Sequence, residues 1–184
     1  MTRLFYIFFS LIFLSSCNPE TKYAEELKDI DSYTNKLDSI EIILNGIEFD
    51  SLVYMQETAH TNEKLMKRFY VNDTIDESFA QKLAYIKSVR KILSDVKDEQ
   101  RRMFAELKAL KVQLSNLKTD ILNGLYNKEQ IVNYLNKEKK DVDMLNKMVV
   151  DFNKMQSIEK NYFYYATPDI ETYLTKAMNE KQDD

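Results

Sequence analysis

A heptad run of apolar residues constrains the fold of this chain more than any other feature. Eleven positions between residues 86 and 121 alternate in steps of three and four, and only Gln100 among them is polar. This spacing places all eleven side chains on one face of a helix. Sustained over five heptads, it predicts coiled-coil-like packing against other helices. The positions are Ile86, Val89, Leu93, Val96, Gln100, Met103, Leu107, Leu110, Leu114, Leu117 and Ile121.

Two further stripes with the same spacing flank this run. The first comprises Tyr23, Leu27, Ile30, Thr34, Leu37, Ile40, Leu44 and Ile47. The second comprises Ile131, Leu135, Val142, Leu145, Val149 and Phe152. Asn45-Gly46 interrupts the first stripe, and Asp50 is placed to cap a restart that continues to Phe69. Both one kinked helix and two helices over residues 23–70 satisfy this pattern.

A second helix is predicted over residues 75–123, with residues typical of helix ends at its start and at its end. Thr74 and Glu77 have the spacing of a capping box at its start. Asn123-Gly124 is typical of a C-terminal cap, because glycine adopts the left-handed conformation at little cost.

A third helix is predicted over residues 128–165, with Asn127 and Gln130 as its capping pair. Thr167-Pro168 is a favourable pair for a cap and first position, so we expect a short separate helix from Pro168 to about Met178.

Glycine and proline are scarce, with two of each among 184 residues. A β-rich domain of this size needs many more turn residues, whereas 30% charged residues is typical of long exposed helices. Short turns between long helices favour antiparallel neighbours. We therefore predict an all-α domain over residues 23–184, an elongated antiparallel three-helix bundle with a short C-terminal helix.

The first residues have the pattern of a secretory signal, with Arg3 before an apolar run from Leu4 to Leu14. That run is too short to cross a bilayer, which takes about 20 residues. The only cysteine, Cys17, follows at once. A transmembrane anchor and a secreted protein with a free thiol are the two alternatives to lipid attachment.

The segment Leu14-Ser15-Ser16-Cys17 resembles the lipobox of bacterial lipoprotein precursors. The resemblance implies that residues 1–16 are removed and that Cys17 becomes the acylated N-terminus. Residues 17–22 would then form an extended tether. The residue after the cysteine is Asn18 and not an aspartate. In this family the lack of an aspartate at this position favours attachment to the outer membrane, on its periplasmic face or at the cell surface. No specific family is evident for the helical part.

The residues offer little that could support catalysis. His60 is the only histidine, and two isolated glycines cannot build a phosphate-binding loop. Carboxylates alternate with lysines, as on a solvated helix face. We predict no enzyme, no cofactor, no metal and no small-molecule substrate. The net charge of −4 also argues against a nucleic-acid partner.

Two aromatic segments are candidate partner-binding sites. Four consecutive aromatic residues cannot all face one core, since neighbours on a helix differ by about 100°. Either the C-terminal helix folds back over them, or some form a docking patch. The candidate residues are Tyr162, Phe163, Tyr164, Tyr165, Phe69 and Tyr70.

These features favour a membrane-anchored, non-catalytic interaction, scaffold or accessory protein of the cell envelope. Its partners would be the membrane, through the lipid, and another envelope protein; a homo-oligomer is also compatible with the heptads. Two alternatives are a chaperone-like holder of unfolded envelope proteins and a surface-exposed binding lipoprotein.

Overall fold

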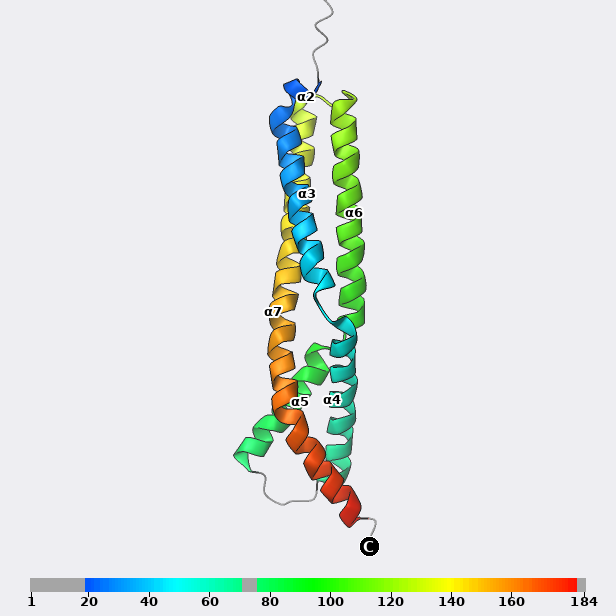
Figure 1. The fold of residues 1–184 in the computed structure, drawn as a ribbon, viewed down its shortest axis with the longest axis vertical. Helices are drawn as coiled ribbons and strands as arrows, with labels where there is room; N and C mark the ends of the chain where they lie inside the picture. The colour runs from blue at the N-terminus through cyan, green and yellow to red at the C-terminus, as the bar shows by residue number, and fades with distance from the viewer. Residues whose placement is uncertain (1–18, 71–75, 182–184) are drawn as a thin grey trace, which may run out of the picture. The chain divides into compact units, whose positions relative to one another are not determined.

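The computed structural model describes residues 19–70 and 76–181, and their regular structure is entirely helical. Its helices are α2 (Pro19–Lys22), α3 (Ala24–Asn45), α4 (Phe49–Phe69), α5 (Glu77–Ile92), α6 (Val96–Leu122) and α7 (Lys128–Glu180) (Figure 1). The predicted all-α class is therefore confirmed. The predicted signal peptide, Cys17 and Thr74 lie outside the described residues.

The chain divides into two compact units. Unit 1 comprises Met1–Asp38 and Lys108–Asp143, and unit 2 comprises Ser39–Leu107 and Met144–Asp184. Helices α3, α6 and α7 each contribute one part to each unit. Within the described residues, each unit has its own buried apolar side chains.

Unit 1 is built from parts of α3, α6 and α7 lying side by side (Figure 1). The buried apolar positions follow the predicted stripes: Tyr23, Ile30, Leu37, Leu110, Leu114, Leu117, Ile121, Ile131, Leu135 and Val142. Ion pairs flank this core. On α6, Lys118 contacts Asp31 of α3 at 2.7 Å, while Lys36 of α3 contacts Asp143 of α7 at 2.6 Å. Heptad packing of three helices thus accounts for this unit.

The turn between α6 and α7 has the predicted caps. Gly124 has a φ of 69°, and its N–H donates to the carbonyl of Ile121 at 3.0 Å. The N–H of Leu125 donates to the carbonyl of Asp120 at 3.0 Å, which completes a Schellman motif. The capping box of Asn127 and Gln130 is also confirmed, with each side chain accepting from the other residue's backbone N–H at 3.0 Å.

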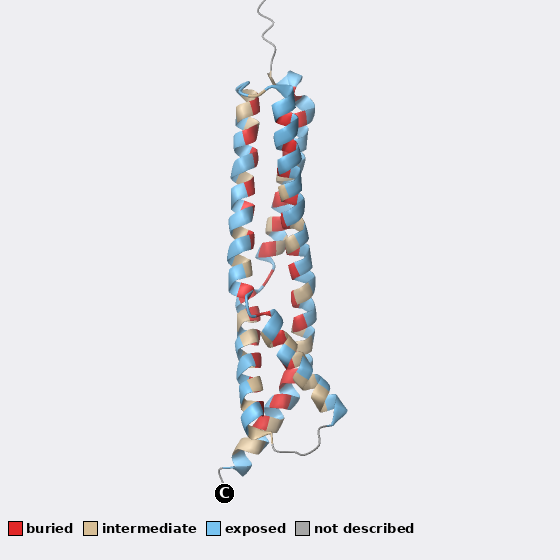
Figure 2. Ribbon diagram, turned by 180° about the vertical axis from the view of Figure 1, so that it is seen from behind, coloured by how far each residue is buried: buried red, intermediate tan, exposed pale blue. Residues whose placement is uncertain are grey.

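Unit 2 combines α4 and α5 with the last part of α3, the first part of α6 and the last part of α7. Its buried residues face inward along each helix, as Figure 2 shows. The ring of Phe49 on α4 contacts Phe152 of α7 and Phe104 of α6, with ring centroids 5.6 and 6.3 Å apart. Aromatic packing at the start of α4 thus joins three helices of this unit.

The interval between residues 23 and 70 holds two helices. The chain leaves α3 at Asn45 and begins α4 at Phe49. Asp50 was predicted to cap the restart, but the N-cap is Glu48, which makes no side-chain capping bond, and Asp50 lies in the first turn. Both Ile47 and Phe49 are buried. Apolar packing therefore holds this junction in place of a polar cap.

The predicted single helix over residues 75–123 was wrong, because α5 ends at Ile92 and α6 begins at Val96. The Ser94 hydroxyl donates to the carbonyl of Lys91 at 2.9 Å. In an unbroken helix the carbonyl of Lys91 would accept the N–H of Asp95, so the bond from the Ser94 side chain takes the place of a helical hydrogen bond at the end of α5. Leu93 and Val96 are both buried, so the heptad stripe continues through the break and conceals it. The first cap of α5 also differs: it is Asp76, which accepts the N–H of Phe79 at 3.2 Å.

The predicted separate C-terminal helix was wrong too. Helix α7 runs unbroken through Pro168, although proline removes one backbone hydrogen bond there. Phe163, Ala166, Ile170 and Leu174 are buried on both sides of the proline, so packing within unit 2 holds the helix together.

The tether that precedes α3 was expected to be extended, but its residues Pro19–Lys22 are helical. Pro19 occupies the first helical position, which proline favours.

Candidate interaction surface

The aromatic run on α7 is divided between opposite flanks of the helix. Phe163 is buried and Tyr162 is half-buried, whereas Tyr164 and Tyr165 are 63% and 57% exposed. Of the two alternatives for this run, the one in which a C-terminal helix covers it is wrong. Residues 168–178 continue α7 beyond the aromatic run and do not fold back over it.

On one flank of α7, two exposed tyrosines meet over the same buried ring. Tyr54 of α4 is 62% exposed and contacts Phe163 edge-on, with ring centroids 6.3 Å apart. Tyr164 contacts the same ring edge-on at 5.6 Å. We call Tyr54 and Tyr164 the tyrosine pair. Both rings contact Phe163, and most of their surface lies in solvent.

On the other flank, the run packs against α5. Tyr162 stacks on Tyr85 with centroids 4.2 Å apart, and Tyr165 contacts the edge of the same ring at 6.0 Å. Lys82 of α5 lies over the Tyr165 ring and forms an ion pair with Asp169 of α7. The hydrogen bond to Asp169 raises the pKa of Lys82. Tyr162 and Tyr165 thus help to attach α5 to α7.

The second predicted segment lies at the other end of α4. Tyr70 packs against Phe79 of α5 and Tyr173 of α7, with centroids 6.3 and 5.5 Å apart. Phe69 lies beneath the cations of Arg68 and Lys181. Both residues are half-buried. Their contacts are those of a helix-end cluster, separate from the tyrosine pair.

Four polar residues of α7 are buried: Thr167, which precedes Pro168 and is 7% exposed, and three residues at core positions nearer the start of the helix. Glu138, Gln156 and Glu159 are 5–8% exposed and continue the three-four spacing of its apolar stripe. The Glu159 carboxylate accepts the Ser88 hydroxyl of α5 at 3.1 Å with one oxygen, and its other oxygen has no partner among the described residues. Burial raises the pKa of Glu159, and the bond from Ser88 opposes that shift. Burial also raises the pKa of Glu138, with Asp141 adding to the effect.

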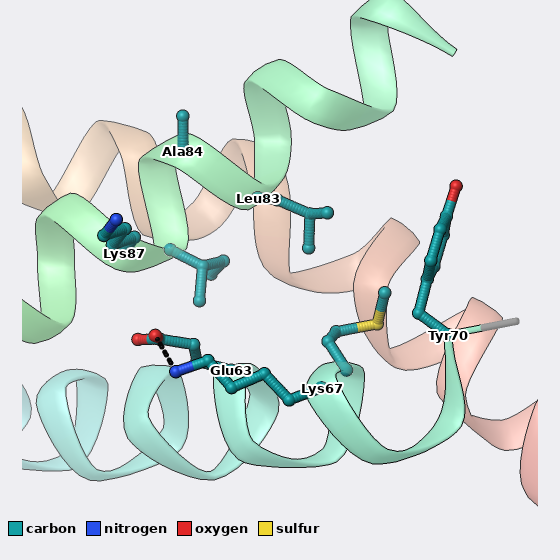
Figure 3. Close-up of a pocket in the computed structure, with 8 residues that line it drawn as sticks. Glu63, Lys67, Tyr70, Leu83, Ala84 and Lys87 are labelled. Carbon is teal, nitrogen blue, oxygen red and sulfur yellow. Dashed lines mark ion pairs between the residues drawn. The ribbon is translucent and has the colours of Figure 1, made fainter. Parts of the chain in front are cut away.

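A pocket of about 360 Å³ lies between α4 and α5. Met66, Leu83 and Ile86 contribute apolar side chains, and Tyr70 lines one end (Figure 3). Towards the other end, Glu63 of α4 forms ion pairs with Lys67 at 2.7 Å and with Arg90 of α5. The hydrogen bond from Lys67 lowers the pKa of Glu63 although burial acts in the opposite direction.

A smaller pocket of about 210 Å³ adjoins it and shares Glu63 and Lys67. Its remaining lining residues are His60, Lys64 and Arg90. The two pockets together give an apolar part followed by a basic part along the same pair of helices.

Within residues 19–70 and 76–181, no group of three or more His, Cys, Asp and Glu side chains is arranged to hold a metal ion. Across the same residues, every helix is too short or too polar to span a membrane. Comparison with family models, curated proteins and solved structures finds no match to this chain.

The structure adds residues that the sequence pattern did not single out. Tyr54 joins Tyr164 only through the packing of α4 on α7, which no local motif indicates. Glu138, Gln156 and Glu159 could have been found, because their spacing continues the apolar stripe on both sides. The α4–α5 pocket depends on which helices are neighbours, so periodicity alone does not predict it.

Proposed function

We propose that this protein is a lipid-anchored, non-catalytic interaction protein of the bacterial cell envelope, and that the tyrosine pair is its partner-binding surface. The observation that carries the proposal is the exposure of Tyr54 and Tyr164, both above 60%, over one buried ring. Tyrosine is enriched at binding hot spots because its rigid ring offers a large contact area at small entropic cost. Two exposed rings that contact the same buried ring fit this role.

The anchor in this proposal is an acylated Cys17. One acyl chain binds a bilayer only reversibly, whereas the two or three chains of a lipoprotein hold the protein there stably. Helix α2 begins two residues after Cys17, and Glu26 of α3 lies 3.7 Å from Lys128 at the start of α7. An anchored chain would thus have the α6–α7 turn of unit 1 beside the membrane, most naturally the outer membrane.

Site-specific photocrosslinking in living cells tests this proposal. A photoreactive phenylalanine analogue replaces Tyr54 or Tyr164, and the matched control replaces Tyr134 of unit 1, which is 41% exposed. We expect a single stoichiometric adduct from the first two positions and none from the control. Equal adducts at all three positions, or none at Tyr54 and Tyr164, would contradict the assigned surface.

The same experiment separates the alternative functions. A ladder of many adducts at the tyrosine pair would identify a chaperone-like holder of unfolded proteins and would defeat the adaptor proposal. Protease treatment of intact cells then distinguishes the side of the membrane. Release of the helical part by the protease would favour a surface-exposed binding lipoprotein.

A further inference from the structure

We propose that the pocket between α4 and α5 binds the acyl chain of a single-chain anionic amphiphile, such as a medium-chain fatty acid. This inference goes beyond the interaction function proposed above and does not depend on it. It rests on the pocket's size, on its lining and on the distribution of charge along it.

The apolar part has the properties of a ligand pocket. Its volume of about 360 Å³ lies within the range of about 300–1,000 Å³ that is typical of small-molecule sites. Met66, Leu83 and Ile86 contribute the apolar wall that a hydrocarbon chain requires. Figure 3 shows Leu83 extending from α5 towards α4, with Tyr70 at one end of the space between them.

The lining changes from apolar to basic along the two adjoining pockets. Helices α4 and α5 are antiparallel, since Glu63 pairs with Arg90 while Tyr70 stacks on Phe79. The apolar end therefore lies near Tyr70, and the basic end lies near Arg90. A molecule with a hydrocarbon tail and a charged head has this same one-way polarity.

The basic end carries an excess of positive charge in a chain whose net charge is −4. Lys64, Lys67, Lys87 and Arg90 line the two pockets, against the single carboxylate of Glu63. Glu63 already contacts Lys67 and Arg90. Neither Lys64 nor Lys87 forms an ion pair with a carboxylate in the described part of the chain. These two ammonium groups are available to an anionic head group.

The fluorescence of an introduced tryptophan provides the measurement. The chain contains no tryptophan, so Tyr70→Trp places a unique reporter at the apolar end of the pocket. The whole protein carrying Y70W is titrated with hexanoate, octanoate, decanoate and dodecanoate below their micelle concentrations. The same change at Tyr54 gives a reporter outside the pocket.

We expect Y70W to respond to the fatty acids and Y54W not to respond. Each buried methylene should tighten binding up to about fourfold, until the tail fills the pocket. Affinity that does not change between hexanoate and dodecanoate would overturn the proposal. So would equal binding of dodecyltrimethylammonium, which has a tail of the same length and a cationic head.

Two sets of variants test the pocket itself. In the Y70W background, Lys64→Glu with Lys87→Glu should weaken dodecanoate binding at least tenfold. Lys147→Glu with Lys154→Glu makes the same charge change at exposed positions of α7 and should alter binding less than twofold. Leu83→Phe, which narrows the apolar part, should weaken dodecanoate binding without lowering the melting temperature. Unchanged binding in both Leu83→Phe and the Lys64/Lys87 variant would refute the site.

A last arm distinguishes a free amphiphile from a membrane surface. The Y70W protein is mixed with vesicles of an anionic two-chain phospholipid in place of fatty acid. We expect no response, because the pocket accommodates one tail. A response to vesicles equal to that to dodecanoate would identify a surface-binding site and contradict a pocket for a single chain.

Discussion

Neutralising the buried carboxyl group of Glu159 should stabilise the protein at neutral pH and leave it unchanged in acid. Glu159 is 5% exposed, and only one of its carboxylate oxygens has a hydrogen-bond partner among the described residues. Burial raises its pKa above the usual 4.5. We therefore expect Glu159→Gln to change how the stability of the protein depends on pH.

The sign follows from the protons that each state binds. In the unfolded chain Glu159 loses its proton near pH 4.5, whereas in the folded chain it keeps the proton to a higher pH. The folded state thus binds more protons between the two pKa values, so this group lowers stability as pH rises through that window. Each unit of pKa difference corresponds to about 1.4 kcal/mol. We expect E159Q to be more stable than the unmodified protein at pH 8, and we expect the difference to disappear as the pH falls below 4.5.

Urea unfolding followed by circular dichroism from pH 4 to pH 8 measures this effect. The quantity to compare is the difference in unfolding free energy between E159Q and the unmodified protein, since other carboxyl groups contribute equally to both. Glu106→Gln, at an exposed position of α6, is the matched control. A difference that is the same at every pH, or a variant that is less stable at pH 8, would show that the burial of Glu159 does not raise its pKa.

Three further predictions concern the fold and are measured by thermal or urea unfolding. Gly124→Ala should lower the unfolding free energy by about 1–2 kcal/mol because Gly124 has a φ of 69°. Gly46→Ala should lower it less, since the nearest atom to the added Cβ is a carbonyl oxygen at 3.4 Å. Equal losses in the two variants would contradict the assigned caps. Pro168→Ala should stabilise by about 1–3 kcal/mol, because it restores a helical hydrogen bond; a loss of stability would contradict an unbroken α7. Leu114→Ala should cost about 2–5 kcal/mol because Leu114 is 1% exposed, and an unchanged midpoint would contradict its core position.

The sequence predicted the buried faces better than the ends of the helices. Heptad spacing identifies the buried face of a helix, and ten of the eleven positions from Ile86 to Ile121 are buried. Caps made by neighbouring residues were also predictable, as at Gly124 and at Asn127 with Gln130. Such features depend on interactions within a few residues of one another.

The breaks were harder to predict because packing decides them. Pro168 favours a helix start locally, yet buried residues on both sides keep α7 continuous. At Ser94 the reverse occurs: the apolar spacing is preserved, and a side-chain bond to Lys91 ends α5. Local propensity and apolar periodicity therefore misplace a boundary wherever they disagree with tertiary contacts.

The candidate surface was predictable only in part. Four adjacent aromatic residues on a helix must point in different directions, which predicts that some are exposed. Which residues are exposed depends on where α4 and α5 pack, and this packing selects Tyr164 and Tyr165. The contribution of Tyr54 arises from the packing of α4 on α7, two helices that lie far apart in the sequence. The pocket beside Leu83 lies between the consecutive helices α4 and α5, and it depends on how their side chains pack.

Intact mass spectrometry of the mature protein tests the lipid anchor. We expect a mature chain that begins at Cys17 and carries two or three acyl chains. In the Cys17→Ala variant, we expect an unprocessed precursor or a protein lost from the membrane fraction. A mature protein that begins at another residue, or that retains an unmodified Cys17 and still fractionates with the membrane, would contradict the lipid-anchored account.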